Sequence, residues 1–303
     1  MAIAAQQVLI LYLIVAVGFA ADRFGIFTQS TAKKSNDLLF YIITPVTIIK
    51  SFLTMEFSRE TVNSLVTAFL CMSATIIVGI LIAIPFFRKD KNGVIYKFGV
   101  SYGNMGYMAL PLCEAMLGSE GVFYCSIGMA SFNIISFIHG VWLMTKDTDE
   151  KGFEPKKIIL NPGVIAVLIG LPLFITGVKL PSVCMSSITH ISNLMTPLAM
   201  LFLGTYIANT DLKTIFKSPQ NYLASFLKLV VLPVIMFFIF KFAGVSGNLL
   251  TACVISAAAP SANNTVMFSA KYGKDTAVAS KEVAFCSLFS VVTIPVMTAL
   301  SYL

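Results

Sequence analysis

Long runs of apolar residues are the feature that most restricts how this chain can fold. A run of about 20 mainly apolar residues matches a helix that crosses a bilayer, and no segment has the alternating pattern of a barrel strand. Hydrophobic residues make up 57% of the chain and charged residues 12%, whereas soluble domains carry about 25% charged residues. The sequence therefore predicts an all-α integral membrane protein, surrounded by the lipid bilayer. Ten transmembrane helices are predicted near residues 4–21, 38–55, 64–87, 96–118, 121–144, 162–180, 183–208, 221–243, 248–272 and 277–303.

The distribution of positive charge predicts the topology. Sixteen Lys and Arg residues lie in the odd-numbered loops, three lie in the even-numbered loops, and neither end carries any. Because loops rich in Lys and Arg stay in the cytoplasm, both termini are predicted to be extracytoplasmic in a multi-pass protein of the cell membrane. This topology explains the net charge of +7 without a nucleic-acid partner. The first apolar run lacks the basic start of a signal peptide and is interpreted as a retained helix.

The sequence contains no pattern typical of an enzyme or of a bound cofactor. The six cysteines lie in or beside apolar runs without CxxC spacing, which favours packing residues over a zinc site or a disulfide framework. HExxH and GxSxG motifs are absent, and the two histidines are far apart in sequence. We therefore expect no catalysis, no metal and no cofactor. His139 could titrate near neutral pH, but a packed, hydrogen-bonded histidine is the favoured interpretation.

Two weak internal similarities divide the chain into halves. Residues 101–121 align without gaps with residues 256–276, and Thr44-Pro45 has a counterpart in Thr196-Pro197. Helices 1 to 5 then correspond to helices 6 to 10, and because five is odd, the second half enters the membrane in the opposite sense. The predicted organisation is a first inverted repeat over residues 1–145, a cytoplasmic linker over 146–160 and a second inverted repeat over 161–303.

Each half contains one helix that is expected to break inside the membrane. Gly99, Gly103 and Asn104 lie near the middle of the fourth run, and Pro260 lies near the middle of the ninth. Glycine and proline weaken helices, and irregular backbone at this depth is tolerated only in a protein interior or along a cavity. Paired broken helices in inverted halves indicate the binding site of a secondary transporter, where helix ends can hold a carboxylate. Simple kinks, or amide bridges between helices, are the alternative.

The predicted substrate-binding residues come from these two breaks. Glycines there permit close approach of the backbone, and the hydroxyl groups are weaker candidates for hydrogen bonds. The set is Asn104, Pro260, Asn263 and Asn264, with Gly103 and Gly106, and with Ser261 and Thr265.

At these residues the sequence resembles the auxin efflux carrier family, which includes bacterial malate and malonate permeases and plant auxin exporters. The stretches that carry the resemblance cover residues 103–112, 161–181, 196–208 and 257–275, with Asn104 on the family's substrate-contacting asparagine. The resemblance implies ten helices in two inverted five-helix repeats, with helices 4 and 9 broken and crossing. It also implies an elevator-type transporter, usually a homodimer. Helices 3–5 and 8–10 form its transport domain, and helices 1, 2, 6 and 7 form its scaffold.

The departures from the plant pattern concern the substrate. Gly103 stands where the plant carriers have proline, and Asn263 and Asn264 replace apolar residues. These changes favour a more polar substrate than an indole acid. The expected function is transport of a small organic anion, either a dicarboxylate such as malate or malonate or an auxin-like monocarboxylate. A carrier of a different solute, a channel and a non-transporting sensor remain alternatives.

Four charged residues fall inside the predicted helices. Lys50 and Glu114 lie in the outer halves of helices 2 and 4, and Lys228 and Glu282 lie in the inner halves of helices 8 and 10. Charges within a membrane are functional hypotheses by default, so Glu114, Glu282 and Lys228 are candidate sites for coupling to H+ or Na+. Snorkelling of the lysines toward the membrane surface is the alternative.

Overall fold

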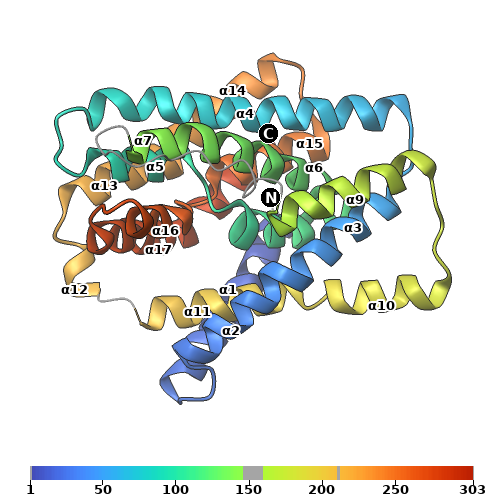
Figure 1. The fold of residues 1–303 in the computed structure, drawn as a ribbon, viewed down its shortest axis with the longest axis horizontal. Coiled ribbons are helices and arrows are strands. Elements are labelled where there is room, and N and C mark those ends of the chain that lie inside the picture. The colour runs from blue at the N-terminus through green and yellow to red at the C-terminus, as the bar shows by residue number, and fades with distance from the viewer. Residues whose placement is uncertain (1, 146–159, 210–211, 303) are drawn as a thin grey trace.

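The computed structural model describes residues 2–145, 160–209 and 212–302, and this part of the chain is helical without a strand (Figure 1). The first half contains α1 (Ala2–Arg23), α2 (Gln29–Leu38), η1 (Leu39–Ile43), α3 (Thr44–Thr54), α4 (Arg59–Phe86), α5 (Gly93–Ser101), η2 (Met105–Ala109), α6 (Leu110–Ile135), η3 (Ser136–Gly140) and α7 (Val141–Thr145). The second half contains α9 (Pro162–Thr176), α10 (Ser182–Ser192), α11 (Met195–Ala208), α12 (Leu212–Ile215), α13 (Pro219–Phe226), η4 (Leu227–Val231), α14 (Leu232–Phe242), α15 (Gly247–Ala258), α16 (Asn264–Lys271) and α17 (Thr276–Leu300).

The helices agree with the all-α prediction for a membrane protein. Five helical stretches are long and apolar enough to cross a membrane, and shorter apolar helices lie between them. The long stretches are Arg59–Phe86, Met105–Thr145, Ser182–Ala208, Pro219–Phe242 and Thr276–Leu300. The π-helical turns η1 to η4 continue their neighbouring α-helices. The predicted linker 146–160 lies, except for Leu160, outside the described residues.

Local chemistry explains where several helices begin and turn. Ser58 caps α4, since its side chain accepts a hydrogen bond from the Thr61 N–H, and Asp275 caps α17 in the same way. Gly118 has φ 61° and ψ −148°, a conformation open essentially to glycine alone, and it separates the two helices within Met105–Thr145. The turn between α10 and α11 was not expected. It lies four residues before Pro197, which has no N–H to continue the helix.

Close backbone packing joins helices from the two halves of the chain. Helix α1 lies along α11, and α3 lies along α9. At the first contact Gly18 and Gly204 let the two backbones touch: a Cβ at Gly18 would lie 2.7 Å from Leu201 Cα, and one at Gly204 would lie 2.6 Å from the Phe19 nitrogen. Small residues commonly serve this purpose between membrane helices. Five of the six free cysteines are buried, as expected for packing residues, and Cys184 is exposed.

Candidate functional site

Two helices stop in the interior of the bundle. Helix α5 ends at Ser101 and the helical backbone resumes at Met105, while α15 ends at Ala258 and α16 begins at Asn264. The two interruptions predicted from Gly103 and Pro260 are therefore present.

The two interrupted segments are hydrogen-bonded to each other. The Asn104 N–H donates to the Pro260 carbonyl at 2.7 Å, and the Ala262 N–H donates to the Tyr102 carbonyl at 2.9 Å. Gly103 thereby lies opposite Ser261 in an isolated antiparallel bridge. This crossing, residues 102–104 paired with 260–262, satisfies backbone groups that would otherwise be unpaired far from water.

A cleft of about 490 Å³ lies beside the crossing, and three helix N-termini contribute to its lining. Asn104 precedes η2, and its Oδ1 accepts a hydrogen bond from the Tyr107 N–H at 3.2 Å. Asn263 precedes α16, and Asn161 caps α9 through a 2.9 Å hydrogen bond from the Gly163 N–H. Helix N-termini carry partial positive charge, although the caps already accept the N–H groups of Tyr107 and Gly163. The described lining of the cleft therefore offers an anion three positive helix ends and several amide side chains, with no Lys or Arg, and opposes it with one carboxylate, that of Asp37.

The remaining walls of the cleft combine rings and thioethers with a few polar groups. Its volume falls within the range of about 300–1,000 Å³ that is usual for small-molecule sites. Asp37 adds a carboxylate, and Thr44 and Asn133 add uncharged polar atoms. The apolar lining includes Phe40, Tyr41, Tyr107, Met129, Phe132, Phe137 and Met267.

The structure separates the predicted substrate residues into two groups. Five line the cleft: Gly103, Asn104, Gly106, Asn263 and Asn264. The others contribute to the crossing or lie behind it. Pro260 accepts the hydrogen bond described above, Ser261 is fully buried, and Thr265 is fully buried with an Oγ1 that has no hydrogen-bond partner in the described part of the chain.

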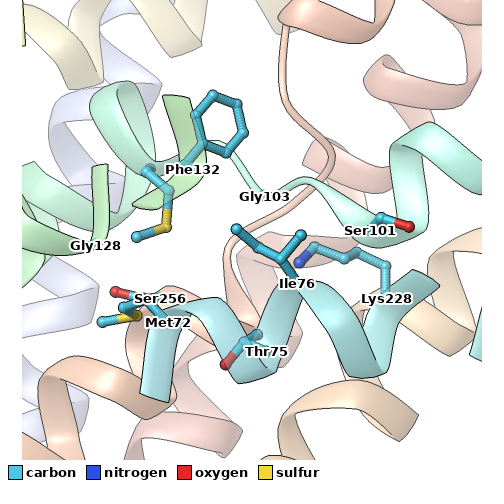
Figure 2. Close-up of a pocket in the computed structure, with 10 residues that line it drawn as sticks. Met72, Thr75, Ile76, Ser101, Gly103, Gly128, Phe132, Lys228 and Ser256 are labelled. Atoms are coloured by element: carbon cyan, nitrogen blue, oxygen red, sulfur yellow. The ribbon is translucent and has the colours of Figure 1, made fainter. Parts of the chain in front are cut away.

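Two buried charged residues lie behind the crossing. Glu282 of α17 is 0% exposed, and its Oε1 accepts a 2.5 Å hydrogen bond from Ser261 Oγ. Lys228 of η4 is 1% exposed, and its Nζ donates to the Ala257 carbonyl at the end of α15, at 3.3 Å. Figure 2 shows Lys228 extending toward the chain segment at Gly103.

Two glycines make room for these charges. A Cβ at Gly99 would lie 2.6 Å from Glu282 Oε1, and one at Gly103 would lie 3.1 Å from Lys228 Nζ. Gly99 and Gly103 of the fourth predicted helix therefore leave space for the side chains of Glu282 and Lys228. Gly103 also lines the cleft.

Glu114 belongs to a different place in the fold. Its carboxylate accepts hydrogen bonds from Ser192 at 3.1 Å and from Thr196 at 2.9 Å, on either side of the turn between α10 and α11. Together with Lys50 it lines a separate cavity of about 230 Å³. Of the three charged candidates, Glu282 and Lys228 both lie behind the crossing and Glu114 does not.

Some residues of the site were not singled out from the sequence. Asn161 Nδ2 donates to Asn133 Oδ1 at 3.3 Å, which joins the start of α9 to α6. Asn161 could have been predicted as a helix cap, because Asn followed by Pro is typical of a helix start. No sequence pattern distinguishes Asn133. His139 was expected to be a packed histidine, and its Nδ1 is 2.9 Å from the hydroxyl of Tyr102 at the crossing.

Comparison with known proteins gives two results. A family model described as "Membrane transport protein" matches residues 3–298. The chain is also similar to the uncharacterized transporter MJ1031 of Methanocaldococcus jannaschii, with 25% identity over 298 residues that cover 95% of each protein.

Proposed function

The chain belongs to the membrane transport protein family, the family of the auxin efflux carriers, and on that premise we propose that it is a secondary transporter of a small organic anion. The observation that carries the proposal is the cleft at the crossing, where the N-termini of η2 and α16 meet beside Asn104, Asn263 and Asn264. Helix N-termini and amide groups bind a carboxylate without a charged side chain. The apolar walls suit the carbon skeleton of the acid. Malate, malonate and an auxin-like monocarboxylate are the candidate substrates.

The position of the cleft supports alternating access by an elevator mechanism. One wall comes from η1, α3 and the start of α9, which correspond to the scaffold helices of the resemblance. The opposite wall comes from η2, α6, η3 and α16, which correspond to the transport domain. A substrate at this boundary would travel with one domain and lose its contacts to the other. Antiparallel pairing of the two breaks is also what two inverted repeats would produce.

The predicted topology indicates the side of the membrane to which the cleft opens in this conformation. With both termini outside, the cleft-lining residues of η1, α9 and α16 fall in the cytoplasmic half of the membrane. A second cavity of about 730 Å³ lies on the same side and shares Asn263 with the cleft. We therefore interpret the conformation as inward-facing.

Counterflow in proteoliposomes tests the proposed function. Vesicles loaded with unlabelled acid are offered labelled malate, malonate or an indole monocarboxylate. Saturable uptake of one acid that depends on the internal acid is expected of a carrier. A channel would give flux without counterflow, and no flux of any acid by folded protein would contradict the proposal.

Asn104→Asp tests the site itself. Asp caps a helix as well as Asn does, so the fold should persist. The new carboxylate should repel the substrate by about 3 kcal/mol at ~5 Å and an effective dielectric constant of ~20, which weakens binding about a hundredfold. Asn63→Asp, at an exposed position of α4, is the matched control. Normal binding by Asn104→Asp would move the site elsewhere.

A further inference from the structure

A buried acid and a buried base lie behind the crossing, and substrate contact accounts for neither. Glu282 and Lys228 are both almost fully buried, and within the described ranges they form no direct ion pair. The Oε2 atom of Glu282 has no hydrogen-bond partner there. Burying two charges without direct contact is costly, so charges of this kind in a membrane protein indicate a function.

From this arrangement we propose that Glu282 is a proton-binding site that couples one proton to each singly charged carboxylate anion carried, with Lys228 as the compensating charge. The inference rests on the proposed carrier function and adds its coupling ion.

The crossing connects the two charges to the cleft. Ser261 pairs with Gly103 through the backbone bridge, while its hydroxyl group holds Glu282. Gly103 lines both the cleft and the small cavity that contains Lys228 (Figure 2). A single backbone segment therefore separates the ammonium group from a bound substrate. Because the separation is so short, the charges of Glu282 and Lys228 strongly affect the electrostatic energy of an anion in the cleft.

The total charge gives the coupling ratio. With Glu282 ionised and Lys228 charged, the empty site is neutral. When Glu282 takes up a proton, the site carries one positive charge, and one singly charged substrate anion, a monocarboxylate or the monoanion of a dicarboxylic acid, restores neutrality. Because a net charge is costly to move through a membrane, the neutral forms are the ones that cross. The anion and the proton then travel together, and the empty site returns without either.

The other titratable groups near Glu282 do not carry compensating charge. Its charge interacts with Cys286 on the same helix, with Tyr96 of α5 and with Tyr206 of α11. A thiol and two phenols are uncharged near pH 6 to 7. Lys228 is the cation that faces Glu282 from the neighbouring η4. Tyr206 also lines the second cavity, on the predicted cytoplasmic side.

Net uptake and exchange of the labelled acid, measured at several pH values, test the proposal in the wild type, Glu282→Gln and the control Glu60→Gln. Wild-type net uptake should depend on pH, with one proton entering per molecule of a monocarboxylate as recorded by a dye inside the vesicles. In Glu282→Gln the loaded site stays neutral but the empty site is positive. Exchange should therefore persist, while net uptake falls about tenfold or more and loses its pH dependence. Glu60→Gln, in the first turn of α4, should behave as wild type.

The outcomes separate the two proposals. Absence of exchange by the wild type counts against carrier function. Wild-type exchange without proton entry, or pH-dependent net uptake by Glu282→Gln, overturns the coupling role. If Glu282→Gln does not fold, Ser261→Ala serves instead. Loss of a hydrogen bond to the ionised carboxyl should move the midpoint of the transport profile toward higher pH. An unmoved midpoint would overturn the proposal.

Discussion

Gly99→Ala tests whether the Glu282 carboxyl is held against helix α5. The added Cβ would lie 2.6 Å from Oε1 and 2.7 Å from Oε2. The carboxyl must therefore retreat, and this movement disrupts the 2.5 Å hydrogen bond from Ser261. Overpacking costs about 1–3 kcal/mol, and a hydrogen bond to a charged group is worth about 1.5–3 kcal/mol. Alanine regains about 1 kcal/mol of helix propensity, so we expect a net destabilisation of about 1.5–5 kcal/mol.

Thermal unfolding of the purified protein in detergent measures this change. Gly106→Ala is the matched control in the same predicted helix, because its Cβ would meet only Met129 Cε, at 3.7 Å. We expect a clear loss of stability for Gly99→Ala, and for the control no loss and a gain of up to about 1 kcal/mol from helix propensity. Combining Gly99→Ala with the shorter Glu282→Asp should recover part of the loss, since the two sites are in contact. Equal stability of the two single variants would refute this account of the packing.

Two further predictions concern contacts outside the crossing. Gly204→Val should drive α1 and α11 apart, because a side chain there meets the Phe19 backbone nitrogen. Little folded protein should then elute on size-exclusion chromatography. A normal monodisperse peak would show that the contact is dispensable. The Glu114 carboxylate accepts one hydrogen bond from Ser192 and one from Thr196, on different oxygens. Glu114→Gln keeps only one of these two acceptor oxygens and removes the negative charge. It should lower the free energy of unfolding by about 1–2 kcal/mol, and wild-type stability in the thermal assay would contradict a role for this contact.

The positions of the helices and of their breaks were open to prediction because they depend on local chemistry. Apolar runs mark helices wherever the backbone must be buried, and α4 and α17 lie close to the predicted segments. Pro260 and Gly103 weaken a helix whatever surrounds them, so both interruptions could be expected. The turn at Gly118 coincides with the predicted end of the fourth helix for the same reason.

The partners of the site residues depended on the tertiary structure. Asn104 and Pro260 are hydrogen-bonded although they lie far apart in sequence, and Ser261 holds Glu282 rather than lining the cleft. Glu114 was grouped with Glu282 because both are acids inside predicted helices, yet it contacts the turn between α10 and α11. The sequence alone determined which segments are buried and where they break, because hydropathy and backbone freedom belong to each residue. Which broken ends meet, and which charges lie behind them, is decided by how the helices pack and rotate about their axes, and those are properties of pairs of segments.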